Sequence, residues 1–298
     1  MRVAVTGSTG LIGTALIAQL RLDGHLVSRL VRRAPSSPDE ITWDPIAGTV
    51  DLAALEGTEA VIHLAGAGVG DHRWTDSYKA EILNSRVLGT QTIAQAMTQL
   101  ASPPAVLVSG SAIGWYGDTH GQIVNEQAPA GQGFLAGVVQ AWEAATAAAQ
   151  DAGIRVVRAR TGLVVARDGG AWARMFPLFR LGVGGKLGPG SQYWSWISLR
   201  DEISALIFCM TNSAISGAVN LTGPAAVTNA EVTAAMGRVM GRPTLLPVPA
   251  AALKLVLGEF STEVLGSIRV TPSVLQAAHF NWADTTVESA ISTAWRSP

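Results

Sequence analysis

Residues 2–13 read Arg2-Val-Ala-Val-Thr-Gly-Ser-Thr-Gly-Leu-Ile-Gly13, an apolar run followed by three glycines in the spacing G-x-x-G-x-x-G. An Ala/Leu/Ile stretch of helical period follows, so the pattern predicts a strand, a tight turn and a helix from about Leu11 to Leu22. At such a turn the free N–H groups of the helix start can hold a phosphate against bare backbone. Gly24 and a second strand at 25–31 complete the unit, which favours dinucleotide binding over an ordinary strand-to-helix turn.

The residues after the second predicted strand select between the two pyridine dinucleotides. An NAD site places a carboxylate at this strand end, about 20 residues past the glycines, to accept a hydrogen bond from the ribose 2′-hydroxyl. This chain has Val31-Arg32-Arg33 there, and the nearest acids, Asp39 and Glu40, lie beyond two prolines. Arg32 and Arg33 could pair with the 2′-phosphate of NADP through forked hydrogen bonds, so we expect NADP(H) as the cofactor. A solvated basic loop is the alternative.

Composition and charge exclude several kinds of function. The 298 residues carry a formal net charge of −1 and 14% charged side chains, so we expect neither a nucleic-acid partner nor binding to an anionic membrane. The single cysteine, Cys209, lies in an apolar stretch, which indicates a buried thiol. The chain opens directly on a strand and has no apolar run of bilayer length, which predicts a cytoplasmic protein that does not span a membrane.

Strands and helices alternate along the rest of the chain, a pattern typical of a parallel sheet. Further strands are predicted at 59–66, 104–111 and 154–160. A long helix is predicted at 76–97, interrupted near Gly89, and another at 134–152. The predicted fold is therefore α/β, with a doubly wound parallel sheet.

Ligands of such sheets bind at the carboxyl ends of the strands, so the residues there form one predicted crevice. The first turn contributes the candidate cofactor-binding residues Gly7, Ser8, Thr9, Gly10, Leu11, Ile12 and Gly13. The later strand ends contribute Arg32, Arg33, Leu64, Ala65, Gly66, Ser109 and Thr161, with Ser111 in the same crevice. His63 ends an otherwise apolar strand, where a core histidine is favoured over a proton shuttle.

Together these motifs resemble the extended short-chain dehydrogenases of the NAD(P)-dependent epimerase/dehydratase type. The matching stretches are Thr6-Gly-x-x-Gly-x-x-Gly13, His63-Leu-Ala-Gly66, Trp115-Tyr116-Gly117, Arg160-Thr-Gly162 and Asp201. A narrower resemblance, to the SulA-like or YfcH-like epimerases, rests on Arg73-Trp74, Ser111-Ala-Ile-Gly-Trp-Tyr-Gly117, Trp142-Glu143, Gly182-Val-Gly-Gly-Lys-Leu-Gly188 and Ser195-Trp-Ile197. The resemblance covers essentially the whole chain and implies a Rossmann-type domain with a smaller C-terminal domain.

The domain division follows from the same pattern. Residues 1–166, rejoined by about 195–223, are predicted to form the dinucleotide-binding domain. Residues 167–194 and 224–298 are predicted to form a smaller substrate-side domain, with a C-terminal appendage from about Pro249. The apolar stretch Ala250–Leu257 could serve internal packing or self-association, so a homo-oligomer stays open. No metal site is expected, because His279 stands alone.

The resemblance implies a catalytic Tyr-x-x-x-Lys pair, which this chain lacks. Where the family carries it, the sequence reads Phe134-Leu-Ala-Gly-Val-Val-Gln140, and none of the three tyrosines precedes a lysine at that step. Tyr116 is the candidate substitute acid, with a packing role as the alternative. Ser111 would be the donor to the substrate carbonyl if one residue is inserted before Tyr116; without a gap that position falls on Ala112.

The second half of the chain concentrates six aromatic side chains in 25 residues: Trp172, Phe176, Phe179, Tyr193, Trp194 and Trp196. They could form a core, or line a substrate site closed by the glycine-rich loop at 182–190.

Two functions stay open from the sequence. One is an NADP-dependent oxidoreductase or epimerase that acts on a small carbonyl or sugar-type substrate and handles protons in a non-standard way. The other is a catalytically inactive NADPH-sensing regulator or scaffold. The intact cofactor motifs favour the enzyme, whereas the missing pair favours the regulator.

Overall fold

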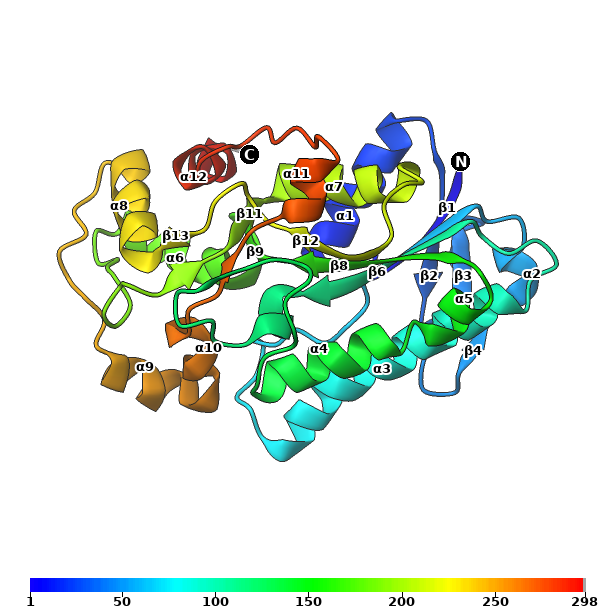
Figure 1. Ribbon diagram of the computed structural model, residues 1–298, viewed down its shortest axis with the longest axis horizontal. Helices are drawn as coiled ribbons and strands as arrows, with labels where there is room; N and C mark the ends of the chain where they lie inside the picture. Colours follow the sequence, from blue (N-terminus) through cyan, green and yellow to red (C-terminus); the bar gives the residue numbers. More distant parts are fainter. Residues whose placement is uncertain (297–298) are drawn as a thin grey trace.

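A computed structural model describes residues 1–296 and contains a central eight-stranded sheet (Figure 1). All neighbouring strands are parallel except the last pair, β3 and β4. In spatial order the strands are β12 (Gly217–Leu221), β8 (Arg155–Thr161), β6 (Val106–Ala112), β5 (Ala60–His63), β1 (Arg2–Thr6), β2 (Leu26–Val31), β3 (Glu40–Asp44) and β4 (Thr49–Val50). The chain starts in the middle of the sheet and winds outward in both directions, so the sheet is doubly wound as predicted.

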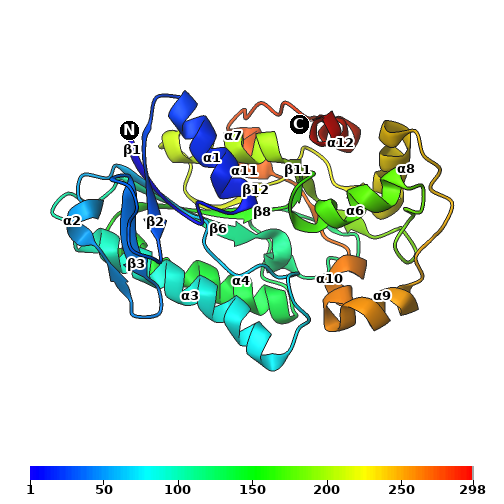
Figure 2. The same ribbon diagram turned by 180° about the vertical axis from the view of Figure 1, so that it is seen from behind.

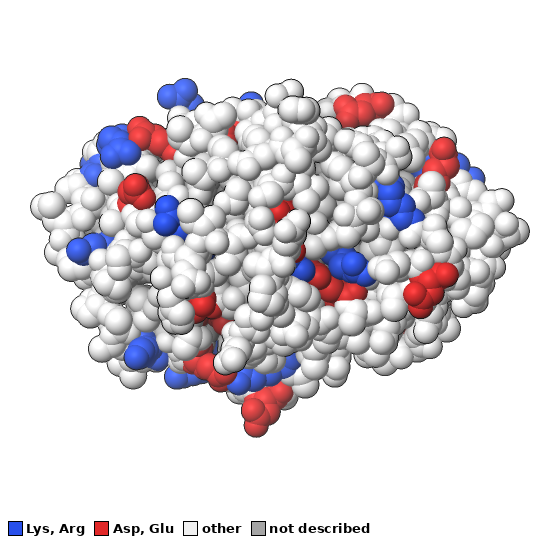
Figure 3. Space-filling view, in the orientation of Figure 1, with Lys and Arg blue, Asp and Glu red and all other residues white. Residues whose placement is uncertain are grey.

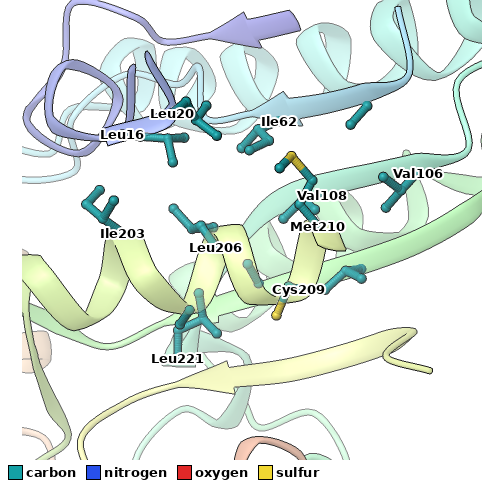
Figure 4. Close-up of a cluster of buried hydrophobic side chains, with 14 of the residues drawn as sticks. Leu16, Leu20, Ile62, Val106, Val108, Ile203, Leu206, Cys209, Met210 and Leu221 are labelled. Carbon is teal, nitrogen blue, oxygen red and sulfur yellow. The ribbon is translucent and has the colours of Figure 1, made fainter. Parts of the chain in front are cut away.

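Helices cover both faces of the sheet (Figures 1 and 2). One face is covered by α1 (Leu11–Leu22), α7 (Leu199–Thr211) and α11 (Ser273–Ala277). The other is covered by α2 (Leu52–Leu55), α3 (Asp76–Thr98), α4 (Phe134–Ala144) and α5 (Ala147–Asp151). Because side chains alternate along a strand, Val3 and Val5 of β1 face the first layer while Ala4 faces the second. Figure 4 shows Leu16 and Leu20 of α1 with Ile203 and Leu206 of α7 in the first layer.

The remaining elements form a smaller unit beside the carboxyl ends of the strands (Figure 2). It contains three short strand pairs: β9 (Leu163–Val165) with β11 (Trp196–Ser198), β10 (Tyr193–Trp194) with β13 (Val227–Thr228), and β7 (Ile123–Val124) with β14 (Arg269–Val270). Its helices are η1 (Ile113–Tyr116), α6 (Gly170–Arg180), α8 (Asn229–Met240), α9 (Ala250–Leu257), η2 (Gly258–Phe260), α10 (Ser261–Leu265) and α12 (Val287–Arg296). The predicted domain end at residue 298 lies just outside the described residues.

Two carboxylates fasten the C-terminal segment to the sheet domain. Asp201 is fully buried, and its two oxygens accept the backbone N–H groups of Ala283 and Asp284 at 2.8 and 2.9 Å. Glu126 accepts the N–H groups of Ser273 and Val274, both at 3.2 Å. Asp201, one of the residues on which the family resemblance rests, therefore holds the C-terminal segment in place.

Two predicted helices differ from the structure. The predicted interruption of α3 near Gly89 is wrong, because the helix runs without a break to Thr98. A Cβ at Gly89 would lie 3.3 Å from the His63 ring, so glycine there allows helix and strand to pack closely. The predicted single helix at 134–152 is also divided, into α4 and α5. At the junction the Thr146 hydroxyl donates to the carbonyl oxygen of Glu143 at 2.7 Å.

Candidate functional site

The three glycines of the first turn are required for different reasons. Gly7 has φ +67°, and a Cβ there would lie 2.8 Å from the backbone of Leu64. A Cβ on Gly13 would lie 2.2 Å from the carbonyl oxygen of Gly7, so this glycine lets α1 pack on the turn. A Cβ on Gly10 would contact only the Gly7 oxygen, at 3.4 Å, and otherwise faces open space. The protein itself therefore does not require a glycine at position 10.

The start of α1 has no side-chain cap. Gly10 is its N-cap and offers no side-chain hydrogen bond, and the first turn carries no acidic residue. The first intrahelical bond is donated by Thr14 to the Gly10 oxygen at 2.9 Å, so the N–H groups of Leu11, Ile12 and Gly13 point out of the helix end. These N–H groups and the positive end of the helix dipole suit a phosphate. Ser8 and Thr9 lie in the turn beside them.

A buried pair, Thr6 and His63, fixes the neighbouring loop. The Thr6 hydroxyl accepts the N–H groups of Leu64 and Ala65 at 3.0 and 3.2 Å, so its own hydrogen is left for Nδ1 of His63 at 2.8 Å. His63 must therefore be unprotonated at Nδ1, and its burial lowers its pKa to about 4. This is the core histidine favoured above. It holds the loop from Leu64 to Gly66 against the glycine turn.

The two arginines after β2 have different surroundings. Arg33 donates to both oxygens of Glu40, at 2.8 and 2.6 Å. Glu40 also pairs with Arg29 at 3.0 Å, and the hydrogen bond from Arg33 is the main reason that its pKa falls to about 2. Arg32 is exposed and, among residues 1–296, takes part in no hydrogen bond or ion pair. Of the two candidates, Arg32 is thus the one with a free guanidinium.

Ser111 lies in a buried charged network. Its hydroxyl donates to Oε1 of Glu143 at 2.6 Å, and Glu143 also pairs with Arg160 at 2.7 and 2.9 Å. All three residues are less than a tenth exposed. Because the hydroxyl hydrogen is already donated to a carboxylate, Ser111 has none left for a substrate carbonyl. Ala112 is the more accessible neighbour, which fits the alignment without a gap.

Tyr116 belongs to the same network. Its hydroxyl donates to Oδ1 of Asn220 at 2.8 Å and accepts from Arg160 at 3.0 Å. The side chain is 4% exposed, and burial raises the pKa of the phenol. These contacts favour the packing interpretation of Tyr116. Nearby, Leu135 and Val139 of α4 lie against Gly114, so the helix presents apolar side chains where the family carries its acid and base.

Two other candidate side chains also point into the protein. Ser109 is 1% exposed and donates to the carbonyl oxygen of Gly110. Thr161 donates to Glu202 at 2.8 Å, and the complete burial of Glu202 raises its pKa to about 8. Glu143, Arg160 and Glu202 lie beside the candidate site residues but are not among those predicted from the sequence. For Glu143 the available signal was a charged residue within an apolar stretch, a position that requires a partner when buried, whereas Glu202 follows two other charged residues and carries no such signal.

The aromatic cluster of the second half is mostly core. Five of the six side chains are buried in one cluster: Trp172, Phe176, Phe179, Trp194 and Trp196. Tyr193 is half-buried, and Arg269 lies over its ring at 4.2 Å. Of the two alternatives given above, the structure therefore favours the core for these five side chains.

Fold and site together define the class of the protein. The strand order, the glycine turn and the free helix end are those of a Rossmann-type, extended short-chain dehydrogenase fold. Among the helices of residues 1–296, none combines the length and the apolar composition of a membrane span. On the face seen in Figure 1, basic and acidic side chains are interspersed among other residues (Figure 3).

The chain belongs to the NAD dependent epimerase/dehydratase family, whose model matches residues 3–222. A second model, a domain of unknown function designated DUF1731, matches residues 248–294. Epimerase family protein ML0860 of Mycobacterium leprae is 44% identical over 297 residues, covering 99% of this chain and 96% of the relative.

Two solved structures are similar over nearly the whole chain. The crystal structure of human epimerase family protein SDR39U1 (isoform 2) with NADPH has a TM-score of 0.92 and 32% identity, covering 99% of this chain and all of that one. A nucleoside-diphosphate sugar epimerase from Corynebacterium glutamicum has a TM-score of 0.81 and 34% identity, covering 98% of this chain and 57% of that one.

Proposed function

We propose that the protein binds NADP(H) and acts as an NADP-dependent oxidoreductase or epimerase on a small carbonyl or sugar-type substrate. One observation carries the cofactor assignment. The N-terminus of α1 is uncapped, and Gly10 beside it faces open space that a side chain could fill. A glycine that packing does not require is explained by a ligand that approaches the backbone, and a pyrophosphate fits this site.

The surroundings of β2 favour NADP(H) over NAD(H). The ribose 2′-hydroxyl of NAD needs a free carboxylate, but the nearest buried one, Glu40, is occupied by Arg29 and Arg33. Arg32 directly follows the strand and has no partner within residues 1–296. A 2′-phosphate would give this guanidinium a charged partner.

The relatives agree with this assignment. The similar human protein was crystallised with NADPH, and the similar Corynebacterium protein is described as a nucleoside-diphosphate sugar epimerase. When bound, the nicotinamide supplies or accepts a hydride. In our proposal the glycine turn holds the pyrophosphate, Arg32 the 2′-phosphate, and the loop 64–66 the middle of the cofactor.

The regulatory alternative is supported by one specific feature. Ser111 and Tyr116, the candidate catalytic residues, are both committed to the buried network around Glu143 and Arg160. Positioned acid–base catalysis contributes about 10²- to 10⁴-fold, so an enzyme without it would be slow unless another group acts. A screen of carbonyl compounds and nucleotide sugars separates the two functions if it follows NADPH absorbance and also analyses the sugar products, because an epimerase returns the hydride to its substrate and leaves NADPH unchanged. Substrate-dependent oxidation of NADPH would exclude a purely regulatory protein.

Calorimetric titration tests the cofactor assignment. We expect NADPH to bind more tightly than NADH, and Arg32→Glu to weaken NADPH binding by roughly tenfold or more while NADH affinity stays within about twofold. Arg242→Glu is the matched control, because within the described part of the chain this exposed arginine donates only to the carbonyl oxygen of Arg180. Equal affinities for the two nucleotides in the wild-type protein would refute the role of Arg32.

A further inference from the structure

One end of the molecule carries an exposed apolar surface. Of the thirteen large apolar side chains exposed in residues 1–296, seven belong to two segments of the smaller unit. Three of them lie at and just after the end of α6, and four lie in α9 and the loop before it: Leu178, Leu181 and Val183, then Leu245, Leu246, Leu255 and Val256. The other six are scattered singly over the first 123 residues, where they need no explanation. We call the seven side chains the end patch.

The two segments of the end patch lie side by side. The N–H of Gly188 donates to the carbonyl oxygen of Val248 at 2.8 Å, and the N–H of Val248 donates to that of Lys186 at 2.9 Å. Closer to α6, a Cβ on Gly182 would lie 3.9 Å from Pro243. In Figures 1 and 2 the loop from α8 to α9 forms one end of the longest axis of the molecule. The end patch is therefore one surface, at an extremity of the protein.

Basic residues accompany the end patch, and acidic residues do not. Residues 169–200 and 232–258 contain no Asp or Glu, but they contain Arg174, Arg180, Lys186, Arg200, Arg238, Arg242 and Lys254. Both acids that flank the second segment are engaged, Glu231 with Thr228 and Glu259 with Lys79. The net charge of −1, on which the expectation of no membrane binding rested, averages over this local excess of positive charge.

Four of these basic side chains are available to a ligand. Arg180, Lys186, Arg242 and Lys254 are exposed, and none forms an ion pair within residues 1–296. The single side-chain hydrogen bond of Arg242 there goes to the carbonyl oxygen of Arg180 and leaves its charge without a countercharge. Lys254 lies on α9 directly before Leu255, so its long stem can follow the apolar side chains while its ammonium group stays in a polar layer.

We propose that the end patch binds the surface of an anionic membrane. The leucine and valine side chains enter the interfacial layer, and the four cations lie at the lipid phosphates. Charge complementarity favours this occupant over a second copy of the chain, whose end patch would bring the same four cations. The side chains also project from the molecule, since Leu245 is 83% and Leu255 is 79% exposed. An extremity of the long axis can meet a planar surface while the sheet domain stays clear of it.

Co-sedimentation with lipid vesicles tests the proposal, which does not depend on the cofactor assignment. The two probes are vesicles of phosphatidylcholine alone and vesicles of equal parts phosphatidylcholine and phosphatidylglycerol. We expect the wild-type protein to bind the mixed vesicles at least roughly tenfold more tightly than the neutral ones, because each basic residue near an anionic surface adds to the attraction. High salt should reduce this difference. Wild-type protein that sediments with neither kind of vesicle would overturn the proposal.

Two pairs of substitutions separate the apolar and the charged contributions. Leu245→Ser with Leu255→Ser should weaken binding to the mixed vesicles by roughly tenfold or more. Arg242→Gln with Lys254→Gln should do the same and leave binding to neutral vesicles unchanged. Leu22→Ser is the matched control, because Leu22 is 80% exposed but lies on α1, and it should bind like the wild type. Thermal unfolding verifies that each variant is folded.

The remaining outcomes assign the end patch to a different occupant. Serine variants that bind the mixed vesicles like the wild type would show that the leucines do not enter the lipid, and would overturn the proposal. Sedimentation velocity without lipid tests for a second copy: a wild-type dimer that the paired serine substitutions convert to a monomer would overturn it as well. A monomeric wild-type protein that binds neither kind of vesicle would leave the end patch to a protein partner.

Discussion

At the scale of single residues, the three glycines of the G-x-x-G-x-x-G motif meet three separate structural requirements. Gly7 is needed for its positive φ and Gly13 for the packing of the helix on the turn, whereas we propose that Gly10 makes room for the bound pyrophosphate. Substitutions should therefore separate stability from cofactor binding within one motif.

Gly10→Val should reduce NADPH affinity by at least about tenfold with little change in stability, because the side chain occupies the space left for the pyrophosphate. Gly13→Ala should destabilise the fold by about 1–3 kcal/mol or more, because its Cβ would overlap the Gly7 oxygen. Calorimetry with NADPH and urea denaturation measure the two effects. A Gly10→Val protein with wild-type affinity would disprove the pyrophosphate site.

Residues whose position follows from local spacing in the sequence could be predicted from the sequence alone. The glycine turn and the place of Arg32 after β2 can be predicted because strand, turn and helix are consecutive in the chain, and the cofactor-binding role of Arg32 stays a prediction. The partners of Ser111 and Tyr116 were not, because Glu143 and Asn220 are distant in sequence and meet them only in the folded sheet. Likewise, the pairing of Arg33 with Glu40 depends on the register of β2 and β3.

At the scale of elements, the ion pair of Glu143 and Arg160 joins α4 to β8 across the carboxyl ends of the strands. Arg160 lies in addition over the rings of Trp115 and Tyr116, at 4.0 and 5.2 Å from their centres. The break between α4 and α5 lies just after Glu143, whose carbonyl oxygen accepts from Thr146 and Arg158. Helical periodicity could not reveal this break, since it arises from a tertiary contact with β8.

Removing one partner of the Glu143–Arg160 ion pair should destabilise the fold. Glu143→Gln leaves the Arg160 guanidinium buried without a countercharge, so the free energy of unfolding should fall by about 3–5 kcal/mol. Replacing both residues, as Glu143→Leu with Arg160→Met, should restore much of that loss, because no charge is then buried. Urea denaturation measures both. A double variant less stable than Glu143→Gln would show that the hydrogen bonds of the network matter more than its charges.

At the scale of the whole molecule, two buried groups give opposite pH dependences to stability. The pKa of Glu202 rises to about 8, so the folded protein keeps a proton that the unfolded chain has lost above pH 4.5. Because of Glu202, the free energy of unfolding therefore falls as the pH rises from 4.5 to 8. The pKa of His63 falls from 6.5 to about 4, so its effect is a loss of stability as the pH drops through that range.

Between pH 4.5 and 6.5, Glu202 and His63 change the free energy of unfolding in opposite directions. From pH 6.5 to 8, only Glu202 of these two groups changes it. Wild-type stability should therefore fall over the upper range, by up to about 1.4 kcal/mol per pH unit. Glu202→Gln should remove that fall and reveal a rise in stability from pH 4.5 to 6.5. Urea denaturation at constant ionic strength from pH 4.5 to 8 checks this. Parallel profiles for the two proteins would assign the pH dependence to other groups.

The attachment of the C-terminal segment by Glu126 and Asp201 bears on how the protein matures during translation. When synthesis reaches Leu221, all eight strands of the sheet exist as polypeptide. The backbone donors for the two carboxylates, residues 273–284, are added several seconds later at ribosomal rates of roughly 5–20 residues per second. During that interval the two carboxylates keep the hydrogen bonds from Ser198 and Asn220 but lack the backbone donors of residues 273–284, so this attachment forms only after the sheet strands have been synthesised.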